Sequence, residues 1–167
     1  MADLRNILSN SDFVVVGGVA TRLYMPERMT LDLDILILTK DAPEIYQRLE
    51  QAGARRLGEL SIGGSSWRLE DGTSLDVLVS DEPWVPPALS TPNVSPDGLP
   101  VIALPYLVLM KLLSSRGVDI GDLSRMLGQA DDQALDEIRA VVGTYLADAA
   151  EDLESLIVLG RLEVEER

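Results

Sequence analysis

The sequence predicts an α+β fold, in which an α/β unit of about 100 residues precedes a helical C-terminal part. Three observations predict it. Short apolar runs alternate with helical patterns near the N-terminus, a hairpin signal follows in the middle of the chain, and helical patterns dominate after Pro105. We therefore expect one domain at residues 1–100, with a Pro-rich loop at residues 81–100, and a helical part at residues 101–167 packed on it.

Helices and strands alternate in the first third of the chain. We expect a helix at residues 3–10, a strand at 13–16, a helix at 18–25, a strand at 31–38 and a helix at 42–53. Gly17 and Gly18 end the first strand, which is short and fully apolar. Pro43 suits the first turn of the third helix, and Gly53 suits its end.

The middle of the chain favours strands. They are expected at residues 55–62, 65–71 and 73–80, with one more short strand within 99–104. Asp71-Gly72 is a strong hairpin signal between two of them. Residues 81–100 hold six of the nine prolines, which predicts a surface loop or linker rather than a core element.

The C-terminal part favours helices. They are expected at residues 105–116 and 119–129, followed by an amphipathic pattern over 132–160. That pattern fits one long helix or two helices broken near Gly143. The charged tail at residues 161–167 is expected to fray.

Composition excludes several classes of site. The chain of 167 residues has no cysteine and no histidine, so thiolate nucleophiles, histidine bases and histidine metal ligands are all absent. A metal site would need oxygen ligands, which favour Mg²⁺ or Mn²⁺. The net charge of −14 argues against an extended nucleic-acid groove. No signal pattern or membrane-length apolar run is present, so we expect a cytoplasmic protein.

Two aspartates interrupt an apolar strand pattern. Side chains alternate along a strand, so Asp32 and Asp34 are expected on one face, roughly 6.5–7 Å apart along the chain. Asp76 similarly interrupts the apolar run at residues 73–80, and it joins the other two if the two strands are neighbours. Three such acids could bind Mg²⁺ for phosphoryl transfer. The alternative is that Asp32 and Asp34 lie at the solvated end of a half-buried strand.

Gly17 and Gly18 stand where a buried strand meets a helix. Glycine permits a ligand to approach the backbone closely, and free N–H groups at a helix start attract phosphate. The alternative is a tight turn that needs a positive φ. The pair matches neither the P-loop nor the dinucleotide-binding fingerprint.

The stretch "GGVATRLYMPERMTLDLDI" resembles the nucleotidyltransferase superfamily that includes DNA polymerase β. The shared pattern is an apolar strand, two small residues, a short helix, two aspartates on the next strand and a third acid later. The match is nearer to the small bacterial branch of minimal, abortive-infection and toxin–antitoxin nucleotidyltransferases. A second motif of that branch corresponds to Lys111, Arg116, Asp119 and Asp122.

The resemblance implies a mixed sheet flanked by helices and a set of site residues. Asp32, Asp34 and Asp76 would hold Mg²⁺ and carry catalysis. The residues implied for nucleotide binding are Gly17, Gly18, Arg28, Thr30 and Lys111. The implied reaction moves a nucleoside monophosphate from an NTP to a hydroxyl of RNA, a protein or a small molecule, with the protein as the toxin-like component of a two-gene system.

Several alternatives stay open. Val118 stands where the family often has lysine, which favours a non-catalytic module that binds a nucleotide or a partner protein, as an antitoxin or regulator would. Lys111 could instead extend from an apolar helix to solvent. Arg116, Asp119 and Asp122 fit a set of ion pairs that positions the helical part.

Overall fold

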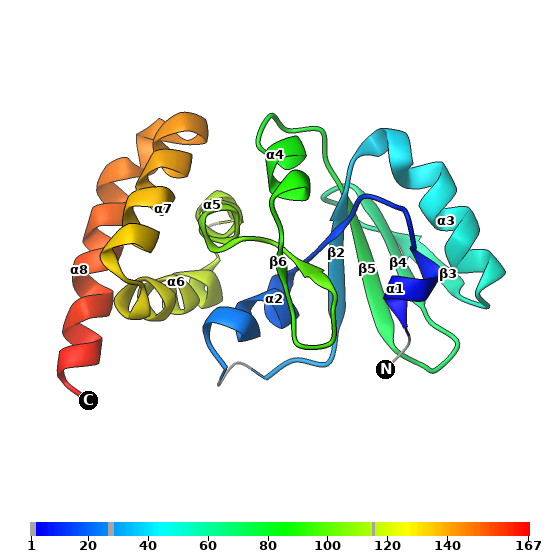
Figure 1. Cartoon of the computed structure of the whole chain (residues 1–167), viewed down its shortest axis with the longest axis horizontal. Coiled ribbons are helices and arrows are strands. Elements are labelled where there is room, and N and C mark those ends of the chain that lie inside the picture. Colours follow the sequence, from blue (N-terminus) through cyan, green and yellow to red (C-terminus); the bar gives the residue numbers. More distant parts are fainter. Residues whose placement is uncertain (1–2, 27–28, 115) are drawn as a thin grey trace. The chain divides into compact units, whose positions relative to one another are not determined.

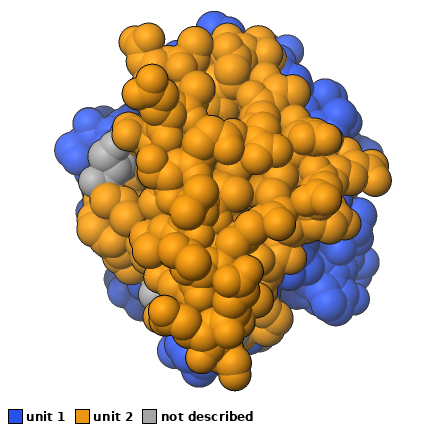
Figure 2. All heavy atoms as spheres, turned by 90° about the vertical axis from the view of Figure 1, so that its left-hand side faces the viewer, with its two compact units in different colours: residues 1–23, 28–102 blue, residues 24–27, 103–167 orange. Residues whose placement is uncertain are grey.

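The computed structural model describes residues 3–26, 29–114 and 116–167. The chain divides into two compact units, unit 1 in residues 1–23 and 28–102 and unit 2 in residues 24–27 and 103–167. Figure 2 colours unit 1 blue and unit 2 orange. The α+β class predicted from the sequence, with a mixed sheet followed by helices, is confirmed.

Unit 1 is built on a seven-stranded mixed sheet within the described residues (Figure 1). Its strand order is β3-β4-β5-β2-β1-β7-β6. The strands are β1 (Val14–Val16), β2 (Leu33–Ile37), β3 (Arg55–Glu59), β4 (Gly64–Arg68), β5 (Ser74–Val79), β6 (Asn93–Val94) and β7 (Pro100–Val101). The β2–β5 and β1–β7 pairs are parallel, and the other pairs are antiparallel.

Helices α1 (Leu4–Ile7), α2 (Gly17–Tyr24) and α3 (Ala42–Gln51) precede or connect the first strands of this sheet. Tyr46 of α3 contacts Trp67 of β4, with ring centroids 5.5 Å apart, so α3 covers the sheet face that carries Trp67. Alternation along β2 places Leu33, Ile35 and Ile37 on this face, and all three are buried. Asp34 therefore projects from the opposite face.

Three expectations need correction. The Pro-rich segment contains α4 (Val85–Ser90), whose Val85 and Ala88 are fully buried, and the strands β6 and β7. Proline fits there because it occupies the first turn of α4, where a backbone N–H lacks an intrahelical partner. The second strand begins at Leu33 instead of residue 31. The C-terminal tail is helical up to Glu165.

Unit 2 consists of helices in its described part (Figure 1). They are α5 (Leu104–Ser114), α6 (Gly117–Gln129), α7 (Asp132–Tyr145), a 3₁₀ turn at Ala147–Ala149, and α8 (Ala150–Glu165). The long amphipathic pattern is thus two helices, and the break follows Tyr145. α6 and α8 pack backbone to backbone, because a methyl group at Gly128 would lie 3.0 Å from Gly160 Cα. No helix in the described ranges is long and apolar enough to cross a membrane.

Candidate functional site

Asp34 and Asp76 are direct partners across the parallel pair β2–β5. Paired residues of neighbouring strands lie on the same face about 4.8 Å apart, so the two carboxylates are adjacent on the sheet. Both residues are half-buried, whereas their chain neighbours Leu33, Ile35, Leu75 and Val77 point to the opposite face and are buried. The two strands are therefore neighbours, which is the condition under which Asp76 was predicted to join the other acids.

Asp32 lies outside this pair. It is exposed and precedes β2 by one residue, because the β2–β5 ladder starts at Leu33 and the β1–β2 ladder reaches only Asp34. Within the described ranges, no group of three or more His, Cys, Asp or Glu side chains could hold a metal ion. Asp34 and Asp76 thus form an adjacent pair, Asp32 lies one residue outside the ladder, and the binding of a metal ion by all three acids stays a prediction.

Ser66 joins the pair from β4, and the sequence did not single it out. It is paired with Asp76 in the ladder, and its Oγ donates a hydrogen bond of 2.6 Å to Asp76 Oδ1. The hairpin signal at Asp71-Gly72 located the turn but left the register open. The turn has three residues and is closed by a hydrogen bond of 2.9 Å from Leu69 N to Thr73 O. A loop of two residues would have placed Trp67 opposite Asp76 instead.

Gly17 lies against Asp34, and Gly18 lies against Thr30. Gly17 has a φ of +66°, and a methyl group there would collide with Asp34 Oδ2 and lie 2.8 Å from Asp34 Cγ. A methyl group at Gly18 would lie 2.8 Å from Thr30 Cγ2. Thr21 Oγ1 donates to Gly17 O at 2.9 Å, which holds the first turn of α2. The start of α2 thus lies directly beside one carboxylate of the pair, and Thr30 borders it.

Two further residues, Arg28 and Lys111, were predicted to bind the nucleotide. Arg28 falls outside the described residues. Lys111 belongs to unit 2, where it is 7% exposed, and its Nζ lies 3.1 Å from both Asp119 Oδ1 and Asp122 Oδ2. Lys111 therefore does not extend to solvent. The ion-pair interpretation of Asp119 and Asp122 matches these contacts.

This buried charge cluster has a clear electrostatic signature. Burial raises the pKa of the Asp119 carboxyl, but hydrogen bonds from Arg116, Ser114 and Lys111 outweigh it and lower the pKa to about 2. Arg116 Nε donates to Asp119 Oδ2 at 2.8 Å. Asp119 is thus ionised at neutral pH and holds α5 to the start of α6.

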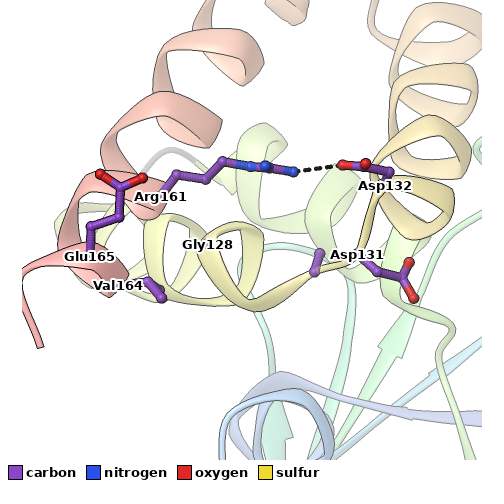
Figure 3. Close-up of a pocket in the computed structure, with 7 residues that line it drawn as sticks. Gly128, Asp131, Asp132, Arg161, Val164 and Glu165 are labelled. Carbon is purple, nitrogen blue, oxygen red and sulfur yellow. Dashed lines mark hydrogen bonds and ion pairs between the residues drawn. The ribbon is translucent and has the colours of Figure 1, made fainter.

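Unit 2 also carries a shallow hollow of about 380 Å³ between α6, α7 and α8 (Figure 3). Arg161 of α8 reaches toward Asp132 of α7, and their ion pair measures 2.9 Å. Asp131 caps α7 by accepting a hydrogen bond of 2.8 Å from Ala134 N. Arg161, Asp132 and Asp131 at this hollow thus pair with one another or with the backbone, which fits a structural role for these three residues.

No protein-family model matches the chain, and a comparison with curated proteins finds no match. Solved structures that resemble it include nucleotidyltransferases. The antibiotic-resistance factor ANT(2'')-Ia aligns over 92% of this chain and 84% of its own, with 14% identity and a TM-score of 0.46. A Thermotoga maritima protein described as a nucleotidyltransferase aligns over 75% of this chain and 88% of its own, with 17% identity and a TM-score of 0.46.

The Thermotoga maritima CCA-adding enzyme, complexed with tRNA, aligns over 92% of this chain but 46% of its own, with 14% identity and a TM-score of 0.42. All of these identities and scores are low. The function proposed for this chain therefore rests on its own residues.

Proposed function

We propose that the protein is an Mg²⁺-dependent nucleotidyltransferase that moves a nucleoside monophosphate from an NTP to a hydroxyl group. The observation that carries this proposal is the adjacent pair Asp34 and Asp76 beside the Gly17 turn. Like charges directly opposite each other in a sheet repel, and a cation bound between Asp34 and Asp76 would relieve that repulsion. The start of α2 next to the two acids could bind the phosphates that such a cation would accompany.

The donor set fits a hard cation, because carboxylate oxygen is the ligand that Mg²⁺ prefers, with Mn²⁺ as the alternative. Asp34 and Asp76 would hold the cation, and Asp32, one residue before β2, would be the third ligand. When bound, the cation would neutralise charge on the phosphates. Asp76 would also accept the proton of the acceptor hydroxyl, with its other oxygen oriented by Ser66.

The chain's own contribution is chiefly alignment of the two reacting groups. Backbone N–H groups at the start of α2 would bind the triphosphate, because free N–H groups and the helix dipole favour phosphate at a helix start. Thr30, which lies against Gly18, would border the nucleotide, and Arg28 stays a predicted nucleotide contact. We assign Lys111 to the buried ion pairs of unit 2 rather than to the nucleotide.

The role of this activity in the cell is a further part of the proposal. The motif resemblance supports the toxin-like component of a toxin–antitoxin or abortive-infection pair, with a partner protein from a neighbouring gene. The second candidate is a non-catalytic module that binds a nucleotide or partner. It is favoured by the position of Asp32, which leaves two acids adjacent instead of three.

Thermal unfolding with each NTP, with and without Mg²⁺, tests the proposal. A ligand that binds the native state raises the melting temperature. We expect an Mg²⁺-dependent shift for at least one NTP, lost in Asp34→Asn and kept in Asp12→Asn, a substitution of an exposed acid in the same unit. Absence of any shift at millimolar NTP would refute the enzyme and favour the partner-binding module. If the shift is present, transfer of label from an α-³²P-labelled NTP would identify the acceptor.

A further inference from the structure

Arg55 and Arg68 lie directly opposite each other on the antiparallel strands β3 and β4. Both are exposed. Arg68 is also paired with Ser74 of β5, two residues before Asp76, and Ser66 is two residues before Arg68 on β4. Because side chains two positions apart share a face, the arginines stand on the same face of the sheet as Ser66 and Asp76.

This arrangement has no structural explanation in the described part of the chain. Like charges directly opposite each other in a sheet are destabilising. The chain has twice as many acidic as basic residues, 28 against 14, yet neither arginine forms an ion pair with a described carboxylate. Arg68 donates one hydrogen bond, of 3.2 Å, to Gly72 O, and Arg55 has no described partner.

Arg56, the next residue of β3, makes a useful contrast. It is paired with Trp67 and so belongs to the opposite face. Its guanidinium lies 5.0 Å from the centre of the Tyr46 ring, and its NH2 atom lies 3.8 Å from Glu59 Oε1. The charge of Arg56 is thus accounted for by its neighbours, whereas the charges of Arg55 and Arg68 are not.

The strand order places this pair on the far side of the acids from the glycine turn. From edge to centre the sheet carries Arg55 on β3, Arg68 and Ser66 on β4, Asp76 on β5, Asp34 on β2 and then Gly17 after β1. Arg68 is one strand and two residues from Asp76, which is roughly 8 Å between their Cα atoms. An arginine side chain can span much of that distance.

We infer that Arg55 and Arg68 form a subsite for a phosphate group on the acceptor substrate. This inference rests on the proposed function, which assigns the NTP phosphates to the glycine side of the acids. The second substrate must then approach Asp76 from the other side, where the two guanidinium groups stand. Paired arginines suit phosphate because each presents a planar fork of N–H donors. The phosphate can belong to a small phosphorylated sugar or to the backbone of a single-stranded RNA end.

Isothermal titration calorimetry at low salt tests the subsite. The probes are ribose 5-phosphate, unphosphorylated ribose and a single-stranded RNA hexamer. We expect the wild type to bind at least one phosphate-bearing probe, and the double variant Arg55→Ala/Arg68→Ala to bind it about tenfold to a hundredfold more weakly. Arg55→Lys/Arg68→Lys should restore part of the affinity, and Arg56→Ala should match the wild type. Preference between the two phosphate probes identifies the source of the phosphate.

The thermal shift with NTP and Mg²⁺ is measured on the same proteins. The double variant should keep that shift, because the NTP is assigned to the glycine side. Equal phosphate affinity in the wild type and the double variant, or no phosphate binding while the NTP shift is present, overturns the subsite and leaves the proposed function intact. Arginine-dependent phosphate binding without any NTP shift keeps the anion site and overturns the proposed function.

Discussion

Asp34 and Asp76, which are 42 positions apart in the sequence, are directly paired on the parallel strands β2 and β5. Their carboxylates meet because β5 adds to the open side of β2 instead of pairing only within its own hairpin. A central position in the sheet gives both acids rigid backbones, whereas Asp32 remains outside the ladder. In the proposed function the pair would provide the fixed part of the cation site, and further ligands would come from outside β2 and β5.

Replacing Asp32 should separate metal binding from folding. Asp32 is exposed, so Asp32→Asn should change the melting temperature little without ligand, by an amount similar to Asp12→Asn. If Asp32 is the third ligand, Asp32→Asn should lose the Mg²⁺-dependent shift with NTP, as Asp34→Asn does. Differential scanning fluorimetry measures both effects. A full shift in Asp32→Asn would restrict the cation site to Asp34 and Asp76.

Gly17→Ala should damage both stability and nucleotide binding. The φ of +66° disfavours a side chain, and the added methyl group would collide with Asp34 Oδ2. We expect a loss of about 2 kcal/mol or more in the free energy of unfolding, measured by urea denaturation, and no NTP shift. Gly58→Ala is the control, because an added methyl group there has no atom within 4 Å. Wild-type stability in Gly17→Ala would contradict the close approach of the turn to Asp34.

The α6–α8 contact should tolerate no side chain at Gly160. A methyl group there would collide with Ser124 O and lie 3.0 Å from Gly128 Cα. Gly160→Ala should therefore lower the free energy of unfolding by about 1–3 kcal/mol. Gly121→Ala, at an exposed position within α6 that has no atom near an added methyl group, should raise it by about 0.5–1 kcal/mol. Denaturation curves that show the same sign for both variants would contradict this packing.

The depressed pKa of Asp119 makes part of the stability depend on pH. Its folded-state pKa of about 2 lies below its ordinary value of 3.8, so the ionised carboxyl stabilises the fold above pH 3.8. This contribution, about 2 kcal/mol, should disappear as the pH falls through about 2. Asp119→Asn lacks it, so the stability difference between wild type and variant should shrink between pH 4 and pH 2.

Urea denaturation at several pH values measures this difference. Asp148→Asn, which changes an exposed acid in the same unit, is the matched control, and its difference from the wild type should stay small throughout. A constant difference for Asp119→Asn from pH 4 to pH 2 would show that the hydrogen bonds from Arg116, Ser114 and Lys111 do not hold the carboxylate as described.

Local pattern alone was sufficient for much of this protein. Apolar periodicity and the proline and glycine positions predicted most of the helices and strands, because these signals act over a few residues. The Pro-rich segment misled the prediction, since proline at the start of α4 is compatible with a short buried helix. The sequence also singled out Asp34, Asp76 and Gly17, since an acid in an apolar strand and paired glycines at a strand end are visible without any partner.

Strand register was decided only by the tertiary structure. Pairing between distant segments placed Asp34 beside Asp76, left Asp32 outside the ladder and brought Ser66 to Asp76. The apolar alternation within each strand disfavours a shift of one residue, because that shift would turn these side chains to the buried face. It does not specify which residue of a neighbouring strand becomes the partner. The same non-local pairing set Arg55 opposite Arg68, and helix packing buried Lys111 between two acids. The sequence by itself therefore identified candidate site residues by their type and local pattern. Which residues became their neighbours depended on contacts between segments far apart in the chain.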